Sequence, residues 1–252
     1  MINLKTPTFQ KLLSSTRRAV DDYQMIREGE RIAVGVSGGK DSMALLAALA
    51  GLSRFYPKKY EIIPIHLQAG FPGSDTSNIK ELCDALQLNL VEVKTDIYEV
   101  VFEIRKEKSP CSLCANLRRG ILYSTAKEHG CNTIALGHHF DDAVETLLMN
   151  LFIEGNLGCF SPVTYLDRMD VTMIRPLLYA KEADLTRFIK AAGITPSPKL
   201  CPVDGNTKRE EFKHFLALAE KRDPGVKERL FGAIERAGLD GFSVHPRGRK
   251  NG

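Results

Sequence analysis

Residues 31–52, "RIAVGVSGGKDSMALLAALAGL", determine the fold class and locate a ligand site. The segment 31–36 is short and apolar after Arg31, which indicates a buried strand. The segment 42–52 consists mostly of strong helix formers, which predicts a helix. Between them lies a glycine turn at 37–41. Because a strand, a glycine turn and a helix start direct free backbone N–H groups at an anion, this stretch predicts a phosphate-binding loop.

The loop differs from the common nucleotide-binding loop G-x-x-x-x-G-K-[ST]. Gly35 to Gly39 is one residue too short for that pattern, and Lys40 is followed by Asp41 instead of Ser or Thr. Glycines permit a close backbone approach, the serine hydroxyls add donors and the lysine adds positive charge. A chance glycine turn before a helix is the alternative interpretation. The candidate nucleotide-binding residues of the loop are Ser37, Gly38, Gly39, Lys40, Asp41 and Ser42.

Strands and helices alternate along the rest of the chain. We expect further strands at 61–67, 89–94, 131–137 and 171–178, and helices at 9–26, 78–88, 111–130, 140–155, 181–193, 207–222 and 226–238. This alternation predicts an α/β fold with a doubly wound parallel sheet. Ligands bind such sheets at the carboxyl ends of the strands. The loop 37–42, "HLQAGFPG" at 66–73 and "LGHHFDD" at 136–142 are therefore expected on one edge.

The composition allows one α/β domain with a small appendage. The chain has 252 residues, of which 43% are hydrophobic, enough for a sizeable core. A net charge of +4 and a pI of about 8.7 permit a nucleic-acid partner without requiring one. No apolar run reaches the ~20 residues that a bilayer requires, and the start lacks a signal-peptide core. We therefore expect a cytoplasmic protein with no membrane partner.

Two of the six cysteines form a C-x-x-C pair, Cys111 and Cys114. In a reducing compartment six cysteines do not imply a disulfide framework, so the pair needs another explanation. Such a pair can chelate a metal centre, whereas a redox pair would need the context of a thioredoxin domain, which this sequence lacks. Zinc normally takes four ligands from two pairs. Three thiolates on a 4Fe–4S cluster would leave one iron open.

The four remaining cysteines stand alone. Cys83 lies at an apolar position of a predicted helix and Cys131 opens a predicted strand, so both are expected in the core. Cys159 lies in a loop and is ambiguous. Cys201 lies between prolines and before a turn, where its thiol is exposed enough to reach a metal.

Five motifs together resemble one family. In chain order they are "SGGKDS" (37–42), "CSLCANLRRGILYSTA" (111–126), "IALGHHFDD" (134–142), "IRPLLY" (174–179) and the cysteine of "CPVDGNTKRE" (201–210). This order resembles the tRNA 2-thiocytidine synthetase family of iron–sulfur-dependent PP-loop tRNA thiolases, from about residue 10 to about 235. The second C-x-x-C that the family often shows around its third ligand is missing here.

The resemblance implies a reaction in which ATP adenylates the C2 carbonyl oxygen of an anticodon-loop cytidine. Sulfur carried by the iron–sulfur cluster then replaces that oxygen, and AMP and pyrophosphate are released. The implied cofactors are ATP, Mg²⁺ and a 4Fe–4S cluster. The implied partners are tRNA, a sulfur donor (a cysteine desulfurase or free sulfide) and a second copy of the chain in a homodimer.

The resemblance also implies roles for individual residues. Cys111, Cys114 and Cys201 would bind the iron–sulfur cluster. The candidate catalytic residues are Lys40, Asp41, Arg118 and Asp142, the two aspartates at the magnesium or phosphate site. Further candidates for nucleotide binding are His66, Gly137, His138 and Arg175. Arg118 and Arg119 would lie near the phosphates or bind tRNA, unless they are an ordinary solvent-facing pair.

We expect four segments: an N-terminal helix at 1–28, a PP-loop ATP pyrophosphatase domain at 29–195, a helical segment with the third cysteine at 196–240 and a disordered basic tail at 241–252. Two other functions fit the same motifs. One is a PP-loop sulfurtransferase for another tRNA position or a small molecule. The other is a non-catalytic metal-binding protein on the same fold.

Overall fold

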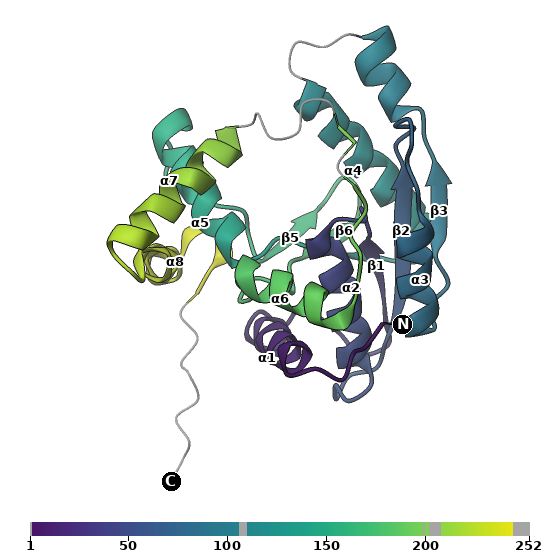
Figure 1. Ribbon diagram of the computed structural model, residues 1–252, viewed down its shortest axis with the longest axis horizontal. Helices are drawn as coiled ribbons and strands as arrows, with labels where there is room; N and C mark the ends of the chain where they lie inside the picture. Colours follow the sequence, from purple (N-terminus) through teal and green to yellow (C-terminus); the bar gives the residue numbers. More distant parts are fainter. Residues whose placement is uncertain (1, 106–109, 199, 202–207, 244–252) are drawn as a thin grey trace.

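A six-stranded sheet forms the centre of the computed structural model, which describes residues 2–105, 110–198, 200–201 and 208–243 (Figure 1). The strand order is β3-β2-β1-β4-β6-β5, and only β5 runs antiparallel to its neighbour. The strands are β1 (Glu30–Gly35), β2 (Tyr60–Gln68), β3 (Val91–Lys94), β4 (Thr133–Ala135), β5 (Val163–Leu166) and β6 (Val171–Ile174). The predicted parallel α/β sheet is confirmed.

The antiparallel strand β5 was not expected from the sequence. It pairs with β6 across a tight turn in which Asp170 has a φ of 47°. Four residues at the edge of a sheet, with the burial pattern exposed, half-buried, exposed, half-buried, carry too weak an apolar signal to be recognised.

The helices agree with the predicted pattern, with short irregular additions. They are α1 (Pro7–Asp22), α2 (Lys40–Ser53), α3 (Ser77–Leu86), α4 (Pro110–Glu128), α5 (Phe140–Met149), α6 (Glu182–Ala192), α7 (Lys208–Arg222) and α8 (Val226–Ala237). The additions are the π-helical turns η1 (Glu99–Ile104) and η2 (Asn150–Glu154) and the 3₁₀ turn η3 (Leu239–Gly241). Within the described ranges, no helix combines the length and the apolar character that crossing a bilayer would require.

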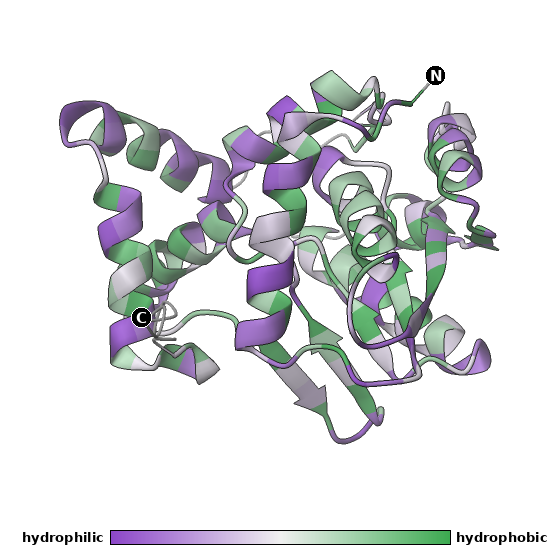
Figure 2. Ribbon diagram, turned by 90° about the horizontal axis from the view of Figure 1, so that it is seen from below, coloured by the Kyte–Doolittle hydropathy of each residue, from purple (hydrophilic) through white to green (hydrophobic). Residues whose placement is uncertain are grey.

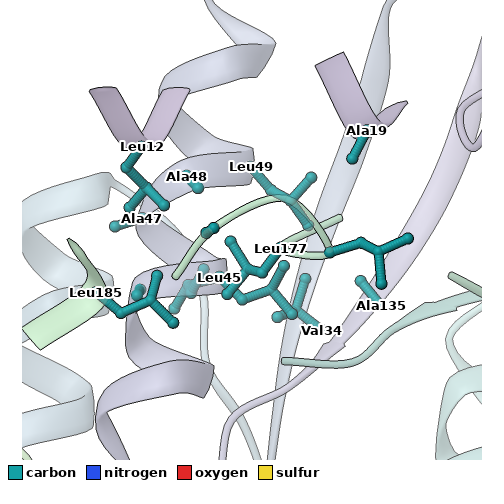
Figure 3. Packing of buried hydrophobic residues seen from close by; sticks show 14 of the residues in the cluster. Leu12, Ala19, Val34, Leu45, Ala47, Ala48, Leu49, Ala135, Leu177 and Leu185 are labelled. Atoms are coloured by element: carbon teal, nitrogen blue, oxygen red, sulfur yellow. The ribbon is translucent and has the colours of Figure 1, made fainter. Parts of the chain in front are cut away.

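Two apolar cores cover the two faces of the sheet. Along β1, Ile32 and Val34 contribute to the larger core, which includes α1, α2 and α6, whereas Ala33 contributes to a smaller core with α4. Figure 3 shows labelled side chains of α1, α2 and α6 in one cluster with Val34 of β1 and Ala135 of β4. In Figure 2 the strands are mostly green, while the outer helices alternate between green and purple. Helix α2 is buried almost all round, as an internal helix should be.

The C-terminal helices form a separate layer over α5. Helix α7 packs on α5, and α8 packs on both α5 and α7, at the opposite side of the molecule from α3 (Figure 1). Of the predicted basic tail at 241–252, residues 244–252 lie outside the described residues.

The strand order reverses between β1 and β4, which makes the gap between them the switch point of the sheet. The loop after β1 is the glycine loop, and the loop after β4 carries "LGHHFDD". Ligands of open α/β sheets bind at such a point because the two loops diverge there. The fold therefore places these two motifs side by side at the carboxyl edge.

Candidate active site

The hydroxyl of Ser42 forms hydrogen bonds that fix the conformation of the glycine loop. It donates to the carbonyl oxygen of Gly39 at 2.9 Å and accepts from the backbone N–H of Ser37 at 3.1 Å. Gly38 has a φ of 84°, a conformation that favours glycine. Gly39 begins α2 without a side-chain cap. The first backbone N–H groups of α2 therefore face the loop and can bind an anion.

Gly38 also meets a residue from beyond α6. The backbone N–H of Ser197 donates to its carbonyl oxygen at 2.9 Å, and a Cβ at Gly38 would lie 2.4 Å from the Ser197 hydroxyl. The segment that leads to Cys201 is thus hydrogen-bonded directly to the glycine loop.

Lys40 lies between carboxylates. Its Nζ is 3.0 Å from Asp41 Oδ1 and 3.0 Å from Glu182 Oε1. Lys213 of α7 contacts the same Glu182 oxygen at 2.7 Å. Burial raises the pKa of Glu182, but hydrogen bonds from Lys213 and Lys40 outweigh it and hold that pKa at about 2. Glu182 therefore stays ionised and keeps both ammonium groups at the loop.

Gly137 allows the loop after β4 to approach the glycine loop. A Cβ at this position would lie 3.2 Å from the backbone carbon of Asp41 and 3.3 Å from the nitrogen of Ser42. Only glycine fits this approach without displacing backbone.

Asp41 and Asp142 meet at His139. The Nε2 of His139 lies 3.7 Å from Asp41 Oδ1 and 3.5 Å from Asp142 Oδ2, and its backbone N–H donates to Asp142 at 2.9 Å. Across the described residues, no three His, Cys, Asp or Glu side chains lie close enough together to hold a single metal ion. Mg²⁺ commonly uses one or two carboxylates and completes its shell with phosphate and water. The two aspartates fit that arrangement.

Glu145 and Arg209 continue the charged rim behind Asp142. Arg209 of α7 lies 3.1 Å from Asp142 Oδ1 and 3.3 Å from Glu145 Oε2. Burial and the neighbouring Asp142 raise the pKa of Glu145 to about 7. On the same helix, Asp141 is 2.7 Å from Lys227 of α8.

The three candidate cysteines converge at the start of α4. Burial raises the pKa of the Cys114 thiol, and Arg118 acts in the opposite direction. The charges of Cys201 and Cys111 raise it further, so both sulfurs lie near Cys114. In a 4Fe–4S cluster each cysteine binds a different iron, so the ligands stand farther apart than around one ion. Three neighbouring thiols from two segments, of which Cys111 is exposed and Cys114 and Cys201 are half-buried, fit such a group.

The other cysteines lie elsewhere. Cys83 and Cys131 are buried in the two cores, as expected. Cys159 packs on α5, where its Sγ lies 3.4 Å from the carbonyl oxygen of Ala143. Burial raises its pKa to about 12, and none of the three converging thiols is among the groups that act on it. We therefore expect Cys159 not to bind the cluster.

Arg118 and Arg119 face different surroundings. Arg118 is half-buried. Burial raises the pKa of Cys114 and lowers that of His66, and the positive charge of Arg118 acts to lower both pKa values. Arg119 is exposed and donates to Asn116 on its own helix. The Nδ1 of His66 lies 2.7 Å from the Val36 carbonyl oxygen, beside the loop. Arg118 thus acts electrostatically on one of the three candidate thiols and on the histidine beside the glycine loop.

His138 and Arg175 lie one strand further along the edge, at the ends of β4 and β6. Burial, followed by the charge of Arg175, lowers the pKa of His138. The ring centre of His138 lies 5.1 Å from the ring centre of Phe160, and the guanidinium carbon of Arg175 lies 4.9 Å from the same centre.

Sequence reasoning missed Glu182, Lys213 and Ser197. Glu182 resembled an ordinary acidic residue at a helix start, and Lys213 an ordinary basic residue on a helix face. Arg209 belonged to a basic pair that suggested only a solvated surface. No local signal could have identified them, because their partners are distant in the sequence.

Comparison with known proteins assigns the chain to a family. The model of the PP-loop domain family matches residues 9–197, which include all six strands. A protein of Geobacter sulfurreducens is 42% identical over 90% of this chain and 89% of its own. One of Syntrophotalea carbinolica is 40% identical over 90% and 88%. Both relatives are named tRNA-cytidine(32) 2-sulfurtransferase.

A solved structure shares the fold. It is the U34-tRNA thiolase NcsA from Methanococcus maripaludis with its 4Fe–4S cluster. The TM-score is 0.73 at 24% identity, over 89% of this chain and 77% of that one.

Proposed function

We propose a reaction for this chain from one premise: it belongs to the PP-loop family, in the group whose curated members are named tRNA-cytidine(32) 2-sulfurtransferase. The reaction replaces the C2 oxygen of an anticodon-loop cytidine with sulfur. ATP is split into AMP and pyrophosphate. The observation that carries the proposal is the meeting of Asp41 of the glycine loop and Asp142 at the switch point, where both carboxylates lie within 3.7 Å of His139 Nε2.

The phosphates of ATP would bind the start of α2. The backbone N–H groups after Gly39 and the ammonium of Lys40 face this position, and Asp41 and Asp142 would hold Mg²⁺ against the phosphate oxygens. The cytidine C2 oxygen attacks the α-phosphorus, and the bond to the β-phosphate oxygen breaks. Positioned donors and cations stabilise the charge that spreads over the phosphate oxygens.

The second half of the reaction exchanges the activated oxygen. A sulfur nucleophile adds to C2, and the C2–O bond breaks as AMP leaves with the oxygen. Cys111, Cys114 and Cys201 would hold a 4Fe–4S cluster, which supplies an iron without a protein ligand that can carry sulfur. Arg118, whose charge acts on Cys114 and on His66, would stabilise negative charge on the sulfur and on the leaving phosphate.

The test uses anaerobically purified protein, tRNA transcript, ATP, Mg²⁺ and sulfide. We expect AMP, pyrophosphate and 2-thiocytidine in equal amounts, measured by chromatography and by mass spectrometry of nucleosides. Lys40→Ala should lower turnover about 10²–10³-fold, because the developing phosphate charge loses a cation. The control Lys208→Ala removes an exposed lysine whose ion pair, among the residues that the structure describes, is with Glu211 of its own helix. ADP as the main product would contradict the proposal.

A further inference from the structure

Arg175, His138 and Phe160 form a polar site beside the nucleotide loop, which we call the Arg175 site. Arg175 is only 6% exposed. One terminal nitrogen donates to the carbonyl oxygen of Ser161 and, at 3.2 Å, to the hydroxyl of Thr164. Its Nε is buried and has no hydrogen-bond partner among the described residues. A donor of this guanidinium is therefore left for a ligand.

The charge of Arg175 is not neutralised. In the part of the chain that the structure describes, no carboxylate forms an ion pair with it, and its guanidinium carbon lies 4.9 Å above the ring centre of Phe160. Burial lowers its pKa to about 10, so it stays charged at neutral pH. A buried charge without a counter-charge reduces stability. A ligand that brings negative charge would remove this penalty.

His138 completes the site. Its Nδ1 is also buried without a hydrogen-bond partner among the described residues, and its ring lies 5.1 Å from Phe160. Burial, followed by the charge of Arg175, lowers its pKa to about 4, so the imidazole is neutral at physiological pH. A neutral imidazole can donate one further hydrogen bond to the same ligand.

The Arg175 site lies across β4 from the phosphate loop. The loop follows β1, Arg175 follows β6, and β4 separates the two strands. Consecutive residues after β4 face opposite ways, since His139 contacts Asp41 of the loop while His138 contacts Phe160. The glycine loop and Lys40, and not the Arg175 site, would therefore bind phosphates at the start of α2. The site is nevertheless adjacent to the reaction, because Asp142 acts electrostatically on His138.

We infer that the Arg175 site binds a backbone phosphate of the RNA substrate. This inference rests on the proposed function, and it assigns Arg175 to the RNA in place of the nucleotide. A phosphodiester oxygen supplies the missing negative charge and accepts from the guanidinium, a pairing for which arginine is well suited. The position one strand from the loop would hold the RNA chain next to Asp142, where the target base must meet ATP.

The test measures binding, without catalysis. Arg175→Gln, Arg175→Lys and His138→Gln are compared with wild type for tRNA transcript affinity over a series of salt concentrations, and for ATP affinity by calorimetry. Arg175→Gln should bind tRNA roughly tenfold more weakly, because a charged hydrogen bond is lost. The slope of log affinity against log salt should fall by about one, the value for one phosphate contact. Arg175→Lys should keep that slope, and ATP affinity should stay within about twofold.

The control is Arg17→Gln, which changes an exposed arginine of α1 whose ion pair, in the described part of the chain, is with Asp21 of its own helix. It should leave both affinities unchanged. The inference is overturned if Arg175→Gln leaves tRNA affinity intact, weakens it at an unchanged salt slope, or weakens ATP instead.

If thermal melting shows that Arg175→Gln does not fold, the His138→Gln variant tests the inference in its place. It should weaken tRNA binding and leave ATP binding intact, and the opposite result rejects the site. If wild-type protein binds no tRNA at any salt concentration, the proposed function itself fails. If wild type binds tRNA and the variants bind it equally well, the Arg175 site alone is rejected. The two failures can therefore be told apart.

Discussion

At the scale of single residues, Glu145 of α5 makes the stability of the protein depend on pH. Its folded-state pKa is raised from 4.5 to about 7, mainly by burial and then by Asp142. The folded protein therefore holds a proton that the unfolded chain releases between about pH 4.5 and 7. Since the folded state binds more protons in this window, its stability falls as pH rises through it.

Replacing Glu145 with glutamine removes this titration. We expect the stability of Glu145→Gln relative to wild type to increase between about pH 5 and 8, by an amount on the order of 2 kcal/mol. Urea unfolding at several pH values measures this difference. Glu103→Gln, which changes an exposed glutamate, serves as the control. A difference between Glu145→Gln and wild type that does not vary with pH would show that Glu145 is not desolvated as the structure indicates.

At the scale of elements, α7 is attached to the site by charge. Arg209 contacts Asp142, Glu145 and the hydroxyl of Thr146, all on α5. Truncating Arg209 leaves a buried carboxylate without its partner, which is more damaging than losing an exposed pair. Arg209→Ala should therefore destabilise the protein by about 2 kcal/mol.

The adjacent Lys208 provides a matched comparison, because it begins the same helix and, within the described residues, forms an ion pair with exposed Glu211. Lys208→Ala should change stability by less than about 0.5 kcal/mol. Denaturant unfolding gives both values, and hydrogen exchange should show faster opening of α7 in Arg209→Ala only. Equal effects of the two substitutions would mean that apolar packing, and not charge, holds α7 on α5.

At the scale of the whole molecule, the packing of distant segments brings three thiols together. We expect Cys111→Ser, Cys114→Ser or Cys201→Ser each to abolish or strongly reduce iron binding after anaerobic reconstitution, measured by iron content and visible absorption. Two thiolates rarely retain such a cluster, which takes its ligands from cysteine. Cys159→Ser should leave iron binding intact, because Cys159 packs against α5 away from the three thiols.

Substitution of Cys83 or Cys131, which are both buried, should affect packing alone. Loss of iron in Cys159→Ser to the same extent as in Cys201→Ser would mean a closed, four-cysteine site. An iron available for sulfur would then be absent.

Local architecture could be predicted from the amino-acid sequence. "RIAVGV" followed by "SGGKDS" predicted β1, the loop and α2, because periodicity and glycine placement act over a few residues. The parallel sheet followed from the alternation of such units, and the motif order identified the family, as the comparisons confirm. The edge strand β5 was missed because four half-exposed residues carry little periodic signal.

Which distant side chains meet depends on the tertiary packing. It placed Cys201 where it acts on Cys114, it joined Ser197 to Gly38, and it brought Lys213 to the Glu182 oxygen that Lys40 also contacts. It also separated Arg118 from Arg119, which look equivalent in the sequence. The physical reason is that local propensity fixes each helix and strand, whereas contacts between segments far apart in the chain depend on how whole elements pack. Helix periodicity specifies which face is buried but not which neighbour covers it.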